Sequence, residues 1–197
     1  MSYSKYKKIK TVIKKFNLDL QLIDLFDNIT PTPPSAWLKE TLRKSTIQPL
    51  INEKAKAERI ISPILMEIAE EYASQISLFS GENLDVNEDL TGECDFFFAL
   101  HPPKLYIDAP IITLVEAKDE DMEHGLAQCA AQLYGAKLFN EQENRSIPVL
   151  FGCATTGTDW KFIRFENNVF YADKKIYTDI SEILGVWHHV IQVFLKK

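Results

Sequence analysis

One segment of the chain, residues 110–118, constrains the fold more than any other. After Pro110 it continues as Ile-Ile-Thr-Leu-Val, an apolar, β-branched run that is typical of a well-buried strand. Two opposite charges then follow, Glu116 and Lys118, with one residue between them. Because side chains alternate between the two faces of a strand, Glu116 and Lys118 share one side. The segment therefore predicts a buried strand with a charged end.

The charged end has two interpretations. Burying a carboxylate or an ammonium group costs free energy unless the group is paired or holds a metal. In the simpler interpretation the strand ends at Glu116 and its last residues face water, and an isolated Glu-x-Lys favours this. The other interpretation requires partners for both charges elsewhere in the chain.

The rest of the chain alternates between helical and strand periodicity, with a turn expected at residues 80–83. Pro63 interrupts the longest helical pattern, either by starting a second helix or by kinking a single one. This order predicts an α/β fold with a central mixed β-sheet flanked by helices. We expect helices at residues 11–29 (with a break near Asn17), 36–44, 50–72, 119–140 and 178–195, and strands at residues 84–88, 93–100, 105–107, 110–118, 147–154, 160–165 and 169–171.

A short proline-rich run suggests how the chain is divided. Residues 30–35 read Thr-Pro-Thr-Pro-Pro-Ser, which is typical of a linker. We therefore expect a basic arm with an N-terminal helical extension at residues 1–34, followed by the main domain at residues 35–197. Ser35 is the predicted N-cap of the next helix.

Charge is distributed unevenly along the chain. The net charge is −6, yet the first fifteen residues hold six lysines and no acid, which leaves 16 basic and 28 acidic residues, a balance of −12, for the rest. A body of that charge does not favour tight nucleic-acid binding through bulk charge. The basic arm either contacts phosphate or is a solvated tail, and the tail is the favoured interpretation.

Other features point to a protein of the cytoplasm. No apolar run approaches the roughly 20 residues that span a bilayer, and the N-terminus lacks the pattern of a secretory signal. Cys94, Cys129 and Cys153 are odd in number and far apart, which suggests neither a disulfide framework nor a zinc site. We interpret them as small buried residues in a reducing cytoplasm, and expect no membrane partner.

A second carboxylate stands where a strand should be apolar. Asp95 precedes three phenylalanines at residues 96–98, which imply burial on both faces. If this strand pairs with residues 110–118, Asp95 can face Glu116, and the two carboxylates repel unless a cation lies between them or one keeps its proton. Mg²⁺ typically binds one or two carboxylates together with waters and phosphate oxygens. Lys118, on the same side, could orient or deprotonate a water or stabilise developing negative charge, which together suits phosphodiester hydrolysis.

These residues resemble the motif of the PD-(D/E)XK nuclease-like superfamily, whose members include restriction endonucleases. Asp95 is followed after about twenty residues by Glu116-Ala117-Lys118, and then by a helix that carries Gln128. The resemblance covers about residues 50–165. One departure is Cys94, which stands where many members have a proline before the first acid.

The resemblance implies a restriction endonuclease-like core and a metal-dependent nuclease. In that family the two acids, here Asp95 and Glu116, bind Mg²⁺, for which Mn²⁺ can substitute, and the lysine, here Lys118, assists the attacking water. A glutamate from an upstream helix supports the metal or its waters. The implied substrate is nucleic acid, DNA in preference to RNA, and a homodimer is an arrangement that many such nucleases adopt.

Three glutamates are candidates for the helical position. Glu53 is the first choice, because it lies about ten residues before Pro63, as in restriction-type members, and seven before Ile60, over the apolar stripe. Glu58 is the second choice and Glu67 the third. For each one taken alone, a solvated helix face is the favoured interpretation.

Two glutamines on the helix after the Glu-x-Lys motif are further candidates. In many family members a glutamine on this helix approaches the catalytic lysine or the substrate phosphate, and Gln128 is the residue that the resemblance favours. From the residues alone, Gln128 is equally well an ordinary amide on the helix surface. For Gln132 the surface amide is the favoured interpretation.

Two other functions compete with the nuclease. One is a non-catalytic interaction module that retains the nuclease fold. The other is a small acidic enzyme or binding protein in which Glu116 and Lys118 form a plain surface ion pair. The nuclease requires Asp95, Glu116 and Lys118 to converge at one edge of the sheet, with a helical glutamate in reach.

Overall fold

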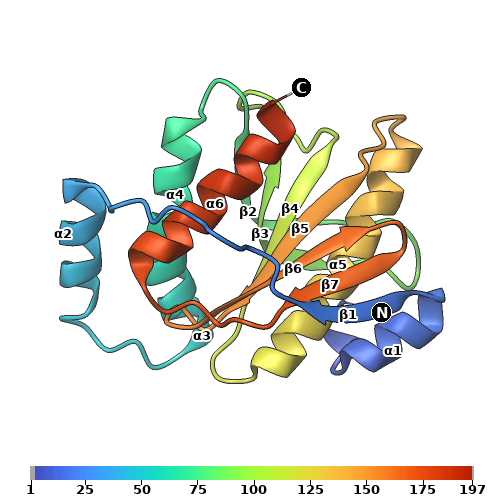
Figure 1. Ribbon diagram of the computed structural model, residues 1–197, viewed down its shortest axis with the longest axis horizontal. Coiled ribbons are helices and arrows are strands. Elements are labelled where there is room, and N and C mark those ends of the chain that lie inside the picture. Colours follow the sequence, from blue (N-terminus) through green and yellow to red (C-terminus); the bar gives the residue numbers. More distant parts are fainter. Residues whose placement is uncertain (1–2, 197) are drawn as a thin grey trace.

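Seven strands form one mixed sheet through the middle of the molecule (Figure 1). The computed structural model describes residues 3–196. The strand order is β1-β7-β6-β5-β4-β3-β2, with β1–β7 and β4–β5 parallel and the other neighbours antiparallel. The strands are β1 (Asp19–Ile23), β2 (Ser77–Asn83), β3 (Glu93–Ala99), β4 (Ile111–Ala117), β5 (Val149–Thr155), β6 (Trp160–Glu166) and β7 (Val169–Asp173). The helices are η1 (Tyr3–Lys5), α1 (Ile9–Phe16), α2 (Ala36–Ser45), α3 (Glu53–Lys56), η2 (Ala57–Ile61), α4 (Ser62–Glu71), α5 (Met122–Gln142) and α6 (Ile180–Leu195).

Strand β4 lies between β3 and β5, and all seven of its residues are buried. Its β-branched and apolar side chains suit a strand that is covered on both faces. The predicted buried strand is confirmed. So is the predicted α/β fold with a central mixed sheet flanked by helices.

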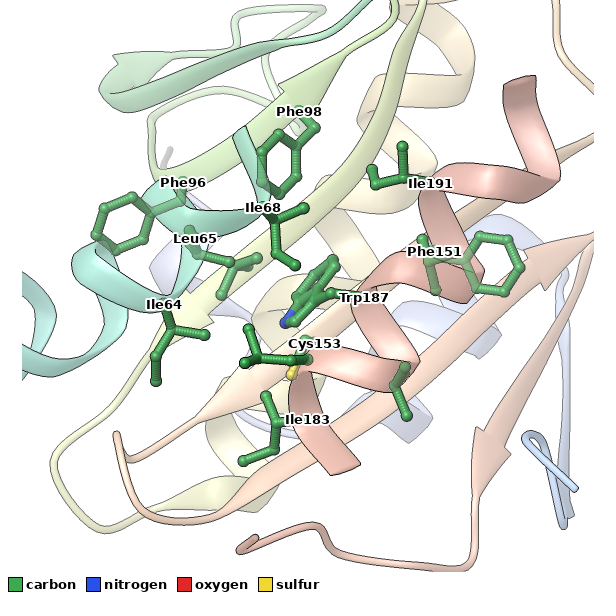
Figure 2. Close-up of a cluster of buried hydrophobic side chains, with 14 of the residues drawn as sticks. Ile64, Leu65, Ile68, Phe96, Phe98, Phe151, Cys153, Ile183, Trp187 and Ile191 are labelled. Carbon is green, nitrogen blue, oxygen red and sulfur yellow. The ribbon is translucent and has the colours of Figure 1, made fainter. Parts of the chain in front are cut away.

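Each face of the sheet has its own hydrophobic core. Helices α4 and α6 cover one face, and Figure 2 shows their side chains packed on those of β3 and β5. Helix α5 covers the other face, and α1 packs on α5. Within residues 3–196 no helix is both long and apolar enough to cross a bilayer. The residues of the first core that Figure 2 labels are Ile64, Leu65 and Ile68 from α4, Ile183, Trp187 and Ile191 from α6, Phe96 and Phe98 from β3, and Phe151 and Cys153 from β5.

The three cysteines are free and buried, as predicted. Cys94 and Cys129 lie in the core beneath α5, and Cys153 lies in the opposite core. Burial raises the pKa of each thiol, so all three remain protonated and serve as small apolar side chains.

The helical segment before β2 is continuous through Pro63. The chain stays helical from α3 through η2 to α4, and η2 is a π-helical turn that ends just before Ser62. Because proline lacks an N–H and its ring crowds the preceding turn, a locally wider turn accommodates Pro63 without ending the helix. Of the two predicted alternatives, the single interrupted helix is the one that forms.

The N-terminal segment differs from its prediction. Helix α1 ends at Asn17, which adopts a left-handed conformation with φ of 53°, and residues 19–23 then form β1 rather than more helix. Strand β1 pairs with β7, so residues 19–23 of the N-terminal segment belong to the same sheet as the rest. The predicted boundary at residue 34 is a change in sequence character rather than a break in the fold. Ser35 caps α2 as predicted, accepting from the backbone N–H of Leu38 at 3.1 Å.

Two predicted strands were misplaced. Strand β2 covers residues 77–83, which includes the predicted turn at residues 80–83, whereas the strand predicted at 84–88 is a loop. Residues 105–107 also lie in a loop. The polar, glycine-containing sequence of β2 forms a strand because it pairs along its length with β3, a contact that local periodicity does not reveal.

Candidate active site

The end of β4 places a carboxylate and an ammonium group on one side of the sheet. The backbone N–H of Lys118 donates to the carbonyl oxygen of Thr155 at 2.8 Å, so the pairing with β5 continues beyond the last residue of β4. This keeps the alternation of side chains, and Lys118 Nζ donates to Oε1 of Glu116 at 2.7 Å. Glu116 is only 2% exposed. The simpler prediction, a strand end that faces water, was therefore wrong.

Helix α5 supplies the second partner of Glu116. Its N-terminus is fixed by Asp121, whose side chain accepts from the backbone N–H of His124 at 2.9 Å. Three turns into the helix, the fully buried Gln132 donates from Nε2 to Oε2 of Glu116 at 2.7 Å. Both carboxylate oxygens of Glu116 thus accept a hydrogen bond, one charged and one neutral.

The two glutamines of α5 are placed differently from the expectation. Gln132, predicted to be a surface amide, is the residue that contacts Glu116. Gln128 lies one turn earlier and is 7% exposed, and its side chain has no hydrogen-bond partner within residues 3–196. The surrounding Ala130, Ala131 and Leu133 could have signalled that Gln132 points inward, because the helix is apolar on both sides of it.

Strand β3 brings Asp95 beside Glu116. Phe96 is paired with Val115, and the same antiparallel register carried one residue further places Asp95 opposite Glu116. Oδ2 of Asp95 accepts from the backbone N–H of Ala117 at 2.7 Å. Where β3 and β4 separate, the Asp95 carboxylate therefore accepts the hydrogen bond from Ala117 that a backbone carbonyl group accepts within a paired sheet. Asp95, Glu116 and Lys118 converge as the nuclease hypothesis requires.

Burial and mutual repulsion shift the acids of this cluster. Burial, followed by the negative charge of Asp95, raises the pKa of Glu116 well above its ordinary value, although Lys118 and Gln132 oppose this. Burial also raises the pKa of Asp95, against the opposing effects of the Ala117 N–H and Lys118. Desolvation disfavours the charged form of a carboxyl group, and a nearby like charge does the same. The two acids therefore hold a proton more readily than exposed carboxyl groups do.

Lys118 supplies the positive charge of the cluster. Burial would lower the pKa of Lys118, but the charge of Glu116 and the hydrogen bond between them outweigh it, with a further contribution from Glu53, and the pKa is raised. Lys118 is consequently an ammonium group at neutral pH in this arrangement. It neutralises acids here and is not poised to accept a proton.

Of the three candidate helical glutamates, Glu53 is the one that reaches this cluster. Its Oε1 lies 3.6 Å from Lys118 Nζ. Glu53 is the first residue of α3, which Asn52 caps by accepting from the backbone N–H of Ala55 at 2.8 Å. Lys56 ties α3 to the loop after β4 by donating to the carbonyl oxygen of Asp119 at 2.9 Å.

The other two candidate glutamates have different partners. Glu58 lies 3.9 Å from Lys54 in an exposed ion pair. Glu67 lies on α4, where it accepts from the backbone N–H of Ser35 at 2.8 Å and so holds the start of α2. Glu67 is therefore a structural contact between two helices and is separate from the cluster.

A glycine on α5 makes room for Lys118. A Cβ atom placed on Gly125 would lie 2.9 Å from Cγ of Lys118 and 3.2 Å from Cβ of Ala154. The first separation is shorter than real Cβ contacts. The aliphatic part of Lys118 therefore lies directly against the helix at this point, which fixes the direction in which its ammonium group points.

A pocket of about 470 Å³ opens beside Asp95 and Glu53. It is strongly acidic, with four carboxylates and one lysine on its walls, and Glu116 and Lys118 do not line it. Its lining residues come from α3, η2, α4, β2, β3 and β4: Glu53, Lys54, Ala57, Glu58, Ser62, Ser80, Gly81, Glu93, Asp95, Phe96 and Ala117.

The donor set suits a hard divalent cation in its chemistry. Carboxylate oxygens are the ligands that Mg²⁺ prefers, and Asp95, Glu116 and Glu53 supply them. Within residues 3–196 no three acidic, histidine or cysteine side chains are already grouped as metal ligands. In this arrangement Lys118 and Gln132 donate to the two oxygens of Glu116. Lys118 thus places a positive charge beside Glu116 and Glu53.

Comparisons with known proteins identified no relative of this chain. No protein-family model matches the chain, and a search of curated proteins found no match. The fold and the geometry of the cluster therefore carry the functional argument.

Proposed function

We propose that this protein is a metal-dependent nuclease of the PD-(D/E)XK type, which hydrolyses phosphodiester bonds in nucleic acid, DNA in preference to RNA. One observation carries the proposal. Asp95, Glu116 and Lys118 meet at one end of two central strands, and Glu53 of α3 reaches the same point. One buried acid, a half-buried acid and a half-buried ammonium group stabilise a fold poorly, because their desolvation offsets the attraction between them. Perturbed acids beside a pocket are instead typical of functional sites.

Each residue has a role in such a reaction. Asp95, Glu116 and Glu53 would hold Mg²⁺, or Mn²⁺ in its place. A bound divalent ion supplies polarisation of the phosphate and a lowered pKa for a bound water. Lys118 keeps its proton, so it stabilises the negative charge that develops on the phosphate oxygens. Gln132 orients the Glu116 carboxylate through its hydrogen bond.

A second candidate is a non-catalytic interaction module with the same fold. The observation that favours it is that Lys118 and Gln132 satisfy Glu116 completely, so the cluster is self-contained without a metal. In that case the acidic pocket beside Asp95 would bind a cationic or hydrogen-bond-donating partner.

Metal dependence separates the two candidates. We expect the wild-type protein to cleave single- or double-stranded DNA in Mg²⁺ or Mn²⁺, and to cleave RNA more slowly. In EDTA we expect no cleavage of DNA or RNA, because the carboxylates then lack the cation that would bind the phosphate. Gel analysis of end-labelled oligonucleotides measures this. Cleavage that persists in EDTA would contradict the proposal, and the absence of cleavage with every substrate and metal would favour the interaction module.

Gly125→Ala tests whether the position of Lys118 matters for cleavage. The new methyl group must push the Lys118 side chain away, and we expect kcat/KM to fall by about 10- to 100-fold, since small displacements of a reacting group have effects of this size. Alanine favours a helix over glycine by about 1 kcal/mol, which opposes the strain, so Tm should change little. An unchanged cleavage rate would show that this contact does not position Lys118 for the reaction.

A further inference from the structure

The segment before the sheet carries a uniformly basic outer face. Lys7, Lys8, Lys10 and Lys14 are exposed and form no ion pair within residues 3–196. We call these four residues the α1 lysine face. The remaining chain beyond the first fifteen residues has a net charge of −12, so this face is a concentrated positive surface on an acidic protein.

The predicted solvated tail was wrong for residues 3–15, which are packed against the body. Tyr3 and Tyr6 are buried, and the Tyr3 hydroxyl donates to the carbonyl oxygen of Leu84 at 2.9 Å. Lys5 pairs with Asp89 at 2.8 Å, and Lys15 pairs with the same carboxylate. The α1 lysine face is therefore held in a fixed place.

Helix α5 connects this face to the candidate active site. The ring of Phe16 at the end of α1 packs on Tyr134 of α5 with centroids 4.6 Å apart. Gly135 of α5 receives the ring of Tyr3. Gln132, one turn away on the same helix, contacts Glu116. In Figure 1 α1 and the beginning of α5 both lie at the lower edge of the view.

The charges of α1 oppose the stability of the isolated helix. The first turn contains no acid, and the N-cap residue Lys8 makes no side-chain capping bond. Positive charge at a helix N-terminus opposes the macrodipole, and Lys10 and Lys14 repel each other at i, i+4 spacing. An anionic partner relieves both effects.

We propose that the α1 lysine face binds the phosphate backbone of nucleic acid, outside the place where the strand is cleaved. This inference rests on the proposed function, because it assigns the face to the substrate of that site. Phosphates spaced along a strand match several lysines on one rigid face, whereas the acidic body repels the backbone elsewhere.

An anionic membrane is a poorer match for the same charges. A helix that lies in a bilayer interface inserts an apolar face among the lipids. The apolar residues of α1 are turned inward: Val12 is fully buried, and Ile9, Ile13 and Phe16 pack against the core beneath α5. The face therefore offers charge without an apolar anchor.

The test is the salt dependence of binding, measured in EDTA so that no strand is cut. The variant Lys7→Gln/Lys8→Gln/Lys10→Gln/Lys14→Gln is compared with wild type by fluorescence anisotropy on duplex DNA, single-stranded DNA and RNA. Each lysine that neutralises a phosphate contributes about 0.9 to the slope of log Kd against log salt on duplex DNA. We expect the slope to fall by about 3 to 4, so wild-type affinity should drop about 100-fold more than variant affinity between 50 and 200 mM salt.

The control variant makes the same change in net charge at four exposed lysines elsewhere, Lys39, Lys44, Lys175 and Lys196. It should leave the slope almost unchanged. Equal slopes for wild type and the α1 variant would overturn the proposal, as would wild-type protein that binds no nucleic acid at 50 mM salt. So would tight wild-type binding to phosphatidylserine vesicles that is lost in the α1 variant while nucleic-acid binding is kept.

The outcomes separate this proposal from the proposed function. If the slope falls as expected but no metal supports cleavage, the α1 lysine face binds nucleic acid and the nuclease assignment fails. If cleavage occurs in Mg²⁺ but the slopes are equal, the nuclease stands and the backbone is held elsewhere. Glutamine keeps helix propensity and removes the repulsion, so Tm of the α1 variant should equal or exceed that of wild type.

Discussion

If the protein is the proposed nuclease, Glu116→Gln and Lys118→Met are each expected to lower the rate of phosphodiester cleavage by about 10³-fold. In the proposed reaction each variant removes a charge that would act directly on the phosphate or its metal. Glu116→Gln keeps the shape of the side chain but removes the negative charge. Lys118→Met keeps the aliphatic part that lies against Gly125 and removes the ammonium group. The measurement is kcat/KM in Mg²⁺ on a defined oligonucleotide.

Both variants should fold. Without Lys118, Glu116 remains buried, but its pKa is already raised and rises further, so the residue stays neutral by keeping a proton. Circular dichroism and Tm verify this. Glu120→Gln is the matched control, because Glu120 is an exposed acid two residues after Lys118, and it should cleave at the wild-type rate. Equal activity in all four proteins would assign the cleavage to a contaminant or another site.

Much of this site could be predicted from the sequence because its residues break local rules. Asp95 stands before three phenylalanines in a strand, and Glu116 follows the largely apolar run of residues 111–115. A charged side chain in a buried strand requires a partner. Because side chains alternate between the faces of a strand, the sequence predicts on which side that partner lies. The convergence of Asp95, Glu116 and Lys118 followed from these local patterns together with one assumed strand pairing.

What escaped prediction depended on contacts between distant segments. Strand β1 reads Asp-Leu-Gln-Leu-Ile, an alternation of polar and apolar residues that is too short to outweigh the helical spacing of Leu20 and Ile23. Its pairing with β7 makes it a strand. Gln132 was assigned to the surface because a polar residue on a helix usually faces water, although its apolar neighbours Ala130, Ala131 and Leu133 fit an inward position. Both errors arise where tertiary packing overrides local pattern.

The structure also changes the role that the motif suggests for its lysine. A lysine that removes a proton from water must itself be neutral, and Glu116 and Glu53 both hold the Lys118 ammonium in its charged form. Lys118 therefore acts as a fixed positive charge in the metal-free protein. The protonation of its partner Glu116 therefore affects the stability of the site.

The metal-free protein should become less stable as pH rises from mildly acidic values through neutrality. The folded-state pKa of Glu116 is raised above its ordinary value of 4.5, and that of Asp95 is raised as well, in both cases first of all by burial. The folded state then binds more protons than the unfolded state between the ordinary and the raised pKa values, so the free energy of unfolding falls with pH across that window. The expected loss is at least about 1 kcal/mol, since each unit of pKa shift corresponds to about 1.4 kcal/mol.

Glu116→Gln should flatten this dependence and make the protein more stable than wild type at alkaline pH. An amide at position 116 needs no proton to be neutral, and its N–H can donate to Oε1 of Gln132, a buried atom without a hydrogen-bond partner within residues 3–196, once the Gln132 amide rotates. Urea unfolding in EDTA at pH 5, 6.5 and 8 measures the effect. The Glu120→Gln control should follow the wild-type curve. Parallel curves for wild type and Glu116→Gln would mean that Glu116 is ionised throughout and that repulsion from Asp95 is already neutralised by Lys118. Mg²⁺ should restore stability to the wild type, more strongly at pH 8 than at pH 5, and should have little effect on Glu116→Gln. The metal binds the deprotonated carboxylate, which is more populated at pH 8 and which the glutamine variant lacks.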